Sequence, residues 1–294
     1  MNQVSDRLAA LAPSQTLAMS QKSSELKAQG VDVINLSVGE PDFNTPQHIK
    51  DAAKKAIDDN FSHYSPVPGY MDLRQAICAK LKNENGLDFT PEQIVVSNGA
   101  KQSICNTILA LVNPGDEVIL PAPYWVSYVE MVKLAEGKNV IIETGIEQDF
   151  KMTPAQLEAT ITPKTKLIFL CNPNNPTSSQ IDRQTMRIIL DNCKEHGSFV
   201  VVDETYVEFA PHPEEITSIP LAEYYNNLII LRGISKFFAA PGLRLGYAVC
   251  GNRKLLHEID SKKNPWTINS LAAIAGEIMF RDKAYIHDTY QLIA

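Results

Sequence analysis

Lys236 lies in a run of residues whose types could do chemistry together. It follows an apolar stretch at 228–232, and two phenylalanines and an alanine come directly after it. Apolar surroundings would desolvate the amine and favour its neutral, nucleophilic form. Arg244, eight residues further on, can offer a two-pronged contact to a phosphate. Most lysines are solvated at the surface, but the hydroxyl of Ser235, the guanidinium and two nearby glycines favour a nucleophile beside an anion site.

A second segment ends in a carboxylate. Four apolar residues that favour β-structure, at 199–202, precede Asp203. A carboxylate at the end of a buried strand is costly unless a cation meets it, and a protonated ring nitrogen would serve. A carboxylate that caps a neighbouring helix is the alternative, and the pattern alone favours neither.

A third segment, Ser97–Lys101, joins a strand to a helix that we expect to begin near Gln102. Its small residues Gly99 and Ala100 would let backbone amides approach an anion, and a helix N-terminus adds unpaired donors and a favourable dipole. Tight packing of the turn is the alternative interpretation. By itself this segment is a weak signal.

Short β-rich runs alternate with helical patterns from Asp88 onward, which is typical of an α/β domain with a mostly parallel sheet. Such a sheet carries its ligand at the carboxyl ends of its strands, where the three segments lie. The predicted strands are Ile94–Ser97, Glu117–Leu120, Val140–Glu143, Lys166–Cys171, Phe199–Asp203, Leu228–Arg232 and Arg244–Cys250.

Threonine–proline pairs mark three expected helix starts, because each places a side-chain acceptor before a proline that donates no hydrogen bond. They are Thr45–Pro46, Thr90–Pro91 and Thr153–Pro154. Before them, the sequence predicts a helix at Leu17–Gln29 and a short strand at Val31–Ser37. We expect the first 45 residues to form an arm that packs outside the main sheet.

Composition narrows the class of protein. The chain has 294 residues, of which 44% are hydrophobic and 21% charged, with a net charge of -7. This balance is typical of a soluble globular protein and disfavours binding to nucleic acid or anionic membranes. Five widely spaced cysteines and the lack of a signal-like N-terminus predict a reduced, cytoplasmic protein. The six histidines have no close-set ligand spacing, so we predict no metal site.

Several motifs together resemble the class I and II aminotransferases, the fold-type-I pyridoxal-phosphate enzymes. The resemblance runs from about residue 15 onward, and the motifs follow the family's order. The first half is similar to aspartate aminotransferases, whereas the second half resembles histidinol-phosphate aminotransferases and threonine-phosphate decarboxylases. The motifs are Ser37–Phe43, Pro123–Tyr128, Asn172–Thr177, Asp203 with Tyr206, and Ser235–Tyr247.

The resemblance implies a role for each matching residue. Lys236 would hold pyridoxal 5'-phosphate as a Schiff base and move the proton at the substrate Cα. Asp203 would keep the pyridine nitrogen protonated, which preserves the ring as an electron sink. Tyr206 and Asn175 would hydrogen-bond the phenolic oxygen, and Trp125 would stack on the ring.

The resemblance also implies how the phosphate and the substrate are held. Tyr64 would cross from a partner subunit to the phosphate, which implies a homodimer with shared sites. Gly39 would lie near the substrate carboxylate. The expected phosphate ligands are Gly99, Ala100, Lys101, Ser235 and Arg244.

The family's architecture implies a three-layer α/β/α large domain with a mostly parallel, seven-stranded sheet. We expect residues 1–45 to form the arm and part of a small domain, 46–284 the cofactor-binding domain, and 285–294 the start of a C-terminal small domain that is largely absent. No residue matches the arginine with which that domain binds the substrate carboxylate. We therefore expect either a truncated chain or a protein that binds cofactor and turns over poorly. Ser178 stands where the family usually has glycine.

The leading hypothesis is an aminotransferase that moves an amino group between an amino acid, aspartate-like or related, and a 2-oxo acid. A decarboxylase of a phosphorylated amino acid would keep the cofactor and break a different bond. A protein that binds the cofactor without turnover is the third hypothesis. The fold alone does not choose among them.

Overall fold

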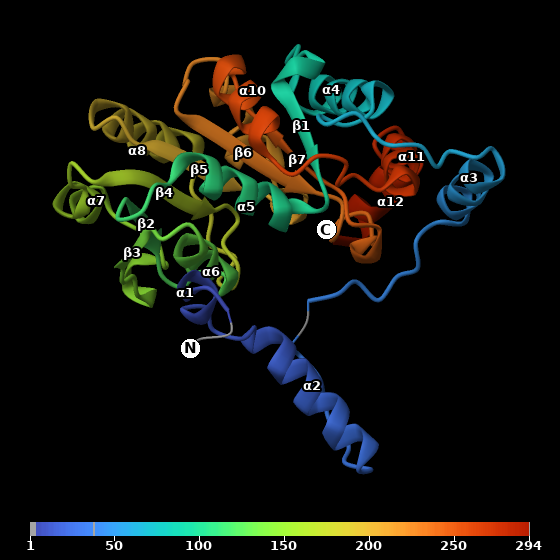
Figure 1. Ribbon diagram of the computed structural model, residues 1–294, viewed down its shortest axis with the longest axis horizontal. Coiled ribbons are helices and arrows are strands. Elements are labelled where there is room, and N and C mark those ends of the chain that lie inside the picture. Colours follow the sequence, from blue (N-terminus) through green and yellow to red (C-terminus); the bar gives the residue numbers. More distant parts are fainter. Residues whose placement is uncertain (1–3, 38, 294) are drawn as a thin grey trace.

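A seven-stranded sheet forms the centre of the molecule in a computed structural model, which describes residues 4–37 and 39–293 (Figure 1). The strand order is β1-β7-β6-β5-β4-β2-β3, and β7 runs in the direction opposite to the other six strands. The strands are β1 (Ile94–Ser97), β2 (Glu117–Pro121), β3 (Lys138–Ile142), β4 (Thr165–Cys171), β5 (Phe199–Asp203), β6 (Leu228–Gly233) and β7 (Gly246–Val249). All seven predicted strands are confirmed, with ends shifted by up to two residues.

The central strands are buried on both faces. Along β5, Val200 and Val202 belong to one apolar cluster and Val201 to the other, because successive side chains of a strand point to opposite faces. The first cluster also contains core residues of α4, α8 and α11, and the second those of α5, α6 and α10. Helices therefore cover both faces, and the predicted three-layer α/β/α architecture is confirmed.

The helices alternate with the strands along most of the chain. Short 3-10 turns occupy several of the remaining connections. The helices are α1 (Asp6–Ala9), α2 (Gln15–Ala28), α3 (Gln47–Asp58), α4 (Met71–Asn85), α5 (Ala100–Leu111), α6 (Ser127–Leu134), α7 (Pro154–Thr160), α8 (Arg183–Glu195), α9 (Pro213–Ile216), α10 (Arg253–Lys262), α11 (Ser270–Met279) and α12 (Lys283–Ile293).

Most of the N-terminal arm stands away from the body, although α1 packs against α6 (Figure 1). Its helix α2 is present as predicted and has no buried residue. The predicted strand at Val31–Ser37 is wrong: the described residues 31–37 form no ladder, and the side chains of Ile34 and Leu36 are 85% and 89% exposed. The local pattern favoured a strand, but no neighbouring strand offers its backbone for pairing.

Two of the three predicted threonine–proline starts carry a capping box, Thr90 with Gln93 and Thr153 with Gln156, and Thr45 does not. Thr153 accepts a hydrogen bond from the Gln156 amide at the start of α7. Thr45 instead donates its hydroxyl to the Ala239 carbonyl, and α3 begins without a side-chain cap. Thr90 opens a single 3-10 turn, Pro91–Gln93, rather than an α-helix, because strand β1 starts directly after it.

The predicted domain boundaries at residues 45 and 284 stay predictions. Residues 1–3, Val38 and Ala294 lie outside the described part of the chain.

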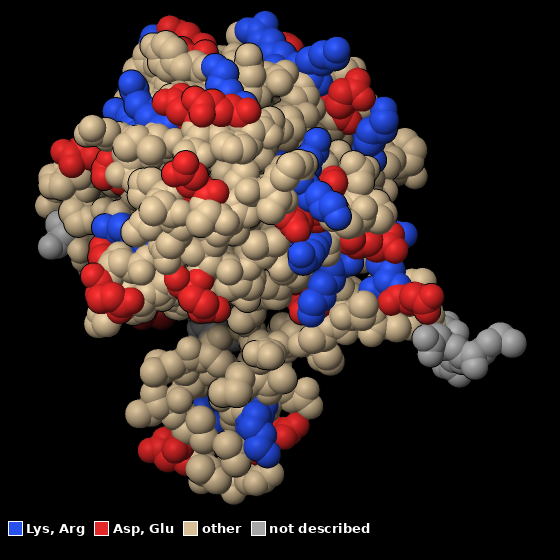
Figure 2. All heavy atoms as spheres, turned by 90° about the vertical axis from the view of Figure 1, so that its left-hand side faces the viewer, with Lys and Arg blue, Asp and Glu red and all other residues tan. Residues whose placement is uncertain are grey.

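Within the described part of the chain, no helix is both long and apolar enough to cross a bilayer. On the face drawn in Figure 2, acidic side chains are spread over the body, and several basic side chains lie close together toward its lower right.

Candidate active site at the carboxyl edge of the sheet

The three segments singled out in the sequence meet at one edge of the sheet. Strands β1, β5 and β6 run in the same direction, since β1 and β6 both pair antiparallel with β7. Ser97 therefore ends β1 at the edge where Asp203 ends β5 and where the chain leaves β6 toward Lys236. The sheet topology brings together residues that are more than 100 positions apart.

Lys236 meets the N-terminal arm at this edge. Its Nζ donates a hydrogen bond to the carbonyl oxygen of Gly39. A Cβ placed on Gly39 would lie 3.8 Å from the Tyr206 hydroxyl and 4.0 Å from Lys236 Nζ. The backbone at Gly39 thus approaches both side chains, with room for ordinary van der Waals contact.

Burial lowers the pKa of Lys236, and the Arg244 charge lowers it further, while Glu40 opposes both effects. The expected surroundings of the amine are wrong in one respect. Phe237 and Phe238 are 3% and 1% exposed and belong to the apolar core. The amine itself is only partly buried, because its neighbours in sequence point into the core rather than around it.

Asp203 is buried, 5% exposed, and well supplied with donors. The Tyr128 hydroxyl donates to Oδ2 at 2.8 Å. The Thr205 amide and hydroxyl donate to Oδ1 at 3.0 and 2.6 Å. Burial raises the pKa of Asp203, and the bonds from Thr205 and Tyr128 oppose that rise.

The carboxylate of Asp203 caps no described helix, and no lysine or arginine pairs with it in the described residues. Its hydrogen bonds come from neutral groups only. The geometry is that of a buried acid held ready for a cationic partner that the chain itself does not supply.

Small residues and an arginine form a cradle at the start of α5. Gly99 has a φ of +84°, and a Cβ there would lie 2.3 Å from Arg244 Nη2. A Cβ on Gly246 would lie 2.3 Å from the Ala100 amide nitrogen. Glycine is therefore required at both positions for the helix start, the guanidinium and β7 to come together.

The amides of Ala100 and Lys101 open α5, and neither donates a hydrogen bond to any described residue. Arg244 Nη1 donates to the Pro241 carbonyl at 2.9 Å, which orients the guanidinium toward Gly99. Ser235 is partly buried beside Lys236. Free amides at the N-terminus of a long helix, with a guanidinium next to them, suit a phosphate group.

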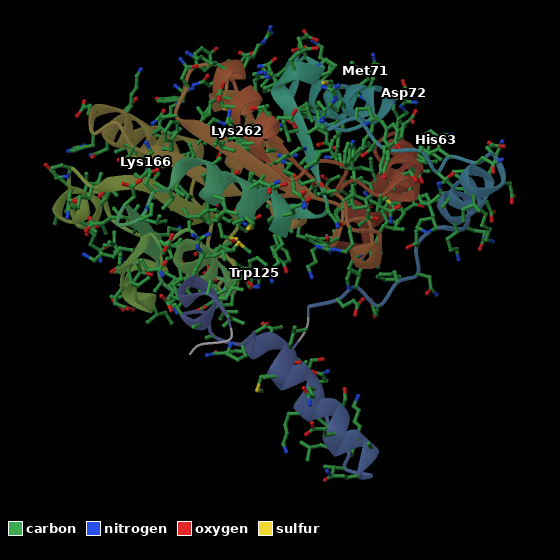
Figure 3. All side chains as sticks on the ribbon, viewed as in Figure 1. His63, Met71, Asp72, Trp125, Lys166 and Lys262 are labelled. Atoms are coloured by element: carbon green, nitrogen blue, oxygen red, sulfur yellow. The ribbon has the colours of Figure 1, made fainter. Side chains whose placement is uncertain are left out.

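Trp125 lies beside the start of α6 (Figure 3). Its ring meets the Tyr128 ring edge-on, with centroids 5.5 Å apart and an interplanar angle of 86°. The ammonium of Lys101 lies 5.1 Å from the Trp125 ring centroid. Trp125 thus connects the start of α5 with the tyrosine that supports Asp203.

Tyr64 lies at the surface, whereas Asn175 shares a cavity with Tyr206. Tyr64 is 81% exposed and stacks on Trp266, with ring centroids 4.8 Å apart. Asn175 lines a cavity of about 250 Å³ together with Tyr206 and Ser178. Within the described chain, Tyr64 makes no hydrogen bond with the other predicted residues.

Sequence reasoning missed the residues that support Asp203. Tyr128 was noticed only as part of a motif, and Thr205 was given no role. An Asp-x-Thr pattern at the end of a strand is a signal for Thr205, because aspartate side chains often bond the backbone two residues on. No local signal marks Tyr128, whose contact with Asp203 spans 75 residues.

One histidine, His212, lies next to two carboxylates that could bind a metal ion together with it. Potential ligand atoms of His212, Glu214 and Glu215 all lie within 4.8 Å of one another, and all three residues are exposed. The histidine spacing along the chain did not predict this group. Exposed acidic groups of this kind are common without an ion, so we assign it no role.

Known proteins share both the sequence and the fold. The family model for aminotransferase class I and II matches residues 31–292. The aspartate/prephenate aminotransferase of Nitrosomonas europaea is 41% identical over 283 residues, which cover 93% of this chain and 70% of that protein. The aspartate aminotransferase of Geobacillus stearothermophilus is 42% identical over 277 residues, covering 92% and 70%.

Solved structures agree. The aspartate aminotransferase from Thermus thermophilus with maleate superimposes with a TM-score of 0.92 at 35% identity, covering all of this chain and 76% of that one. An alanine aminotransferase from Pyrococcus furiosus has a TM-score of 0.87 at 29% identity, covering 98% and 76%. The predicted likeness of the second half to histidinol-phosphate aminotransferases stays a prediction.

Proposed function

The chain belongs to the class I and II aminotransferases, and from that premise we propose that it moves an amino group between aspartate and a 2-oxo acid with pyridoxal 5'-phosphate as cofactor. One observation carries the proposal. At a single edge of the sheet, the amine of Lys236 and the hydroxyl of Tyr206 converge on Gly39, with the buried Asp203 at the end of β5.

The residues at this edge fit the chemical groups of that cofactor. Its aldehyde needs an amine that can lose its proton, and burial lowers the pKa of Lys236. Its protonated ring nitrogen needs an anionic partner, and Asp203 is a buried acid with no lysine or arginine paired to it in the described residues. Its phosphate needs unpaired donors, which the start of α5 and Arg244 supply. When bound, the cofactor supplies an electron sink for the carbanion formed at the substrate Cα.

Each side chain then has a task. Lys236 would hold the cofactor covalently and, once displaced by substrate, its neutral amine would carry the proton at the substrate Cα. Asp203 would hold the proton on the ring nitrogen. Tyr206 and Asn175 would orient the phenolic oxygen, and Trp125 would cover one face of the ring and exclude water from it.

The phosphate would bind between the amides of Ala100 and Lys101, the Ser235 hydroxyl and Arg244. Gly99 leaves room for the guanidinium, so that it can lie against the helix start. These contacts fix the distance between the phosphate and the attachment point, because the cradle and Lys236 are both tied to strand ends. Such fixed geometry is one of the contributions that an enzyme makes to a cofactor reaction.

Aspartate as the amino donor is supported by the names of the relatives. The chain also places one cation, Lys101, beside the proposed ring-covering residue Trp125. The ammonium of Lys101 stands over the Trp125 ring, 5.1 Å from its centroid. A second carboxylate on the substrate would meet this charge.

We further propose a homodimer in which Tyr64 reaches the partner's phosphate site. The tyrosine is 81% exposed and held by stacking on Trp266, so its hydroxyl is free to contact another chain. The cytoplasmic location stays a prediction from the cysteine content.

Borohydride reduction of the protein reconstituted with pyridoxal 5'-phosphate tests the attachment site. Mass spectrometry of the digest should find a pyridoxyl adduct on Lys236, and Lys236→Ala should lose both the adduct and the visible absorbance. Lys254→Ala, which removes an exposed lysine, is the matched control and should keep both. An adduct on another lysine, or none, would refute the proposal.

Product analysis tests the reaction. Aspartate with 2-oxoglutarate should yield oxaloacetate and glutamate. Release of carbon dioxide without an oxo-acid product would favour a decarboxylase instead. A spectrum that no amino acid changes would indicate a protein that binds the cofactor without turnover.

A further inference from the structure

A network of charged side chains is buried behind the candidate site. It joins α4, the end of β5 and the end of β6. Glu204 is 0%, Arg232 and Lys80 are each 3%, and Glu208 is 5% exposed, and the side chain of Glu84 is 28% exposed. Burial alone would lower the pKa of Arg232, but the carboxylates of Glu204 and Glu208 raise it above its usual range. The guanidinium therefore stays charged.

The centre of the network is a two-pronged contact. Arg232 Nε and Nη2 donate to Glu204 Oε2 at 3.1 and 2.8 Å. The Thr217 hydroxyl donates to the same oxygen at 2.9 Å, and the Ser218 amide donates to Oε1. Both Glu204 oxygens and the fork of Arg232 are thus held by fixed partners.

Buried ion pairs are not an efficient source of stability, because desolvation of the two charges offsets most of their attraction. Well-packed apolar residues of similar size would stabilise these strands as well or better. The presence of this pair at the end of two strands calls for another explanation. Its position in the chain supplies one.

Glu204 directly follows Asp203 and stands two residues before Tyr206, and its amide donates to the Leu231 carbonyl at 2.8 Å. Arg232 stands four residues before Lys236 on the adjacent strand. The two side chains that form the pair therefore belong to the two segments that carry the proposed chemistry.

The segment after Arg232 is held at a second point. The Ile234 amide donates to the Leu245 carbonyl at 3.2 Å, which ties the start of the Lys236 turn to the chain that enters β7. The backbone bond from Glu204 to Leu231 also joins the ends of β5 and β6. The contact between Glu204 and Arg232 adds a side-chain tie between the same two strand ends.

We propose that Glu204 and Arg232 are a positioning pair, which sets the place of Lys236 relative to Asp203 and Tyr206 for the reaction. This inference rests on the proposed function. The pair touches neither substrate nor cofactor. It acts through the backbone of two adjacent strand ends.

The test uses two double variants of the full chain. Each replaces one buried cation by methionine and one glutamate by glutamine. Glu204→Gln with Arg232→Met removes the pair between the strands. Lys80→Met with Glu84→Gln removes one cation and one carboxylate from the same network, where Lys80 Nζ lies 2.5 Å from Glu84 Oε2 on α4. Each double variant removes both charges of a pair, so no buried charge loses its only partner and folding is preserved.

Two quantities are measured on each variant, below its unfolding temperature. The dissociation constant for pyridoxal 5'-phosphate comes from an absorbance titration, and kcat and KM come from turnover with aspartate. For the pair at 204 and 232, we expect the dissociation constant to rise at least about tenfold, which is about 1.4 kcal/mol. We expect kcat to fall about 100-fold with little change in KM, because a misplacement of about 1 Å costs that much.

The pair at 80 and 84 should change neither quantity, although its unfolding temperature shifts as well. Equal effects in both double variants would mean that the network only stabilises the fold, and the inference would be wrong. So would an unchanged dissociation constant and kcat in the variant at 204 and 232. If the wild-type protein forms no borohydride-stable adduct at Lys236, the proposed function itself fails.

Discussion

Replacing Tyr128 by phenylalanine removes one hydroxyl from the buried surroundings of Asp203. That hydroxyl donates to Oδ2 at 2.8 Å, and both residues are almost fully buried. A hydrogen bond to a charged group contributes about 1.5–3 kcal/mol, against about 1 kcal/mol for a neutral pair. Because Thr205 still donates twice to the other oxygen, we expect Tyr128→Phe to lower the free energy of unfolding by about 2 kcal/mol at pH 7.

The loss should depend on pH, and its sign follows from Asp203. Burial raises the pKa of this carboxyl above its ordinary value of 3.8, while Thr205 and Tyr128 pull it back. The pKa of this carboxyl is therefore higher in the folded protein than in the unfolded chain. Such a shift favours the folded state below pH 3.8, and this contribution to the free energy of unfolding is lost as the pH rises through the folded pKa. Without the Tyr128 hydroxyl, the folded pKa rises further, so the variant loses more stability than the wild type at neutral pH. The gap should narrow toward about 1 kcal/mol as the pH falls and the carboxyl takes up its proton.

Urea unfolding of the cofactor-free protein at pH 7 and at pH 4.5 measures the loss in the free energy of unfolding and its dependence on pH. Tyr285→Phe is the matched control, because the Tyr285 hydroxyl donates at 2.8 Å to an uncharged acceptor, the Phe237 carbonyl. Its cost should be about 1 kcal/mol at both pH values. A loss for Tyr128→Phe that equals the control would show that Asp203 is not charged at neutral pH. A loss that is the same at both pH values would refute the expected pH dependence.

Further substitutions and a labelling experiment test other parts of the structure. Gly246→Ala places a Cβ 2.3 Å from the Ala100 amide nitrogen, so we expect a loss of about 1–3 kcal/mol in urea unfolding together with weaker phosphate binding, and normal cofactor affinity would contradict the cradle. Ser178→Gly relieves a φ of +64° and should raise the free energy of unfolding by about 0.5 kcal/mol, whereas a loss would show that the serine side chain stabilises the turn. Burial raises the pKa of the Cys171 and Cys193 thiols to about 12, so neither should react with iodoacetamide at pH 8 until the chain unfolds, as mass spectrometry can check.

The local sequence determined the strands and the place of the site. Seven runs of β-favouring residues became seven strands, because each run is four to seven residues long and all except the edge strand β3 are largely buried. Lys236, Asp203 and the turn at Gly99 follow strand ends, and a parallel sheet places such ends at one edge. The apolar runs that form strands, and the alternation of strands with helices that is typical of a parallel sheet, can both be recognised in the sequence without coordinates.

The tertiary structure decided the contacts that make these residues work. The partners of Lys236 and Asp203, namely Gly39 and Tyr128, lie 197 and 75 residues away in sequence. Tertiary structure also explains the wrong prediction of a strand at Val31–Ser37. The sequence pattern favours a strand there, but no other strand lies beside these residues to pair with them. Pairing and side-chain contact depend on which segments the folded chain makes neighbours, and no pattern within a single segment carries that information.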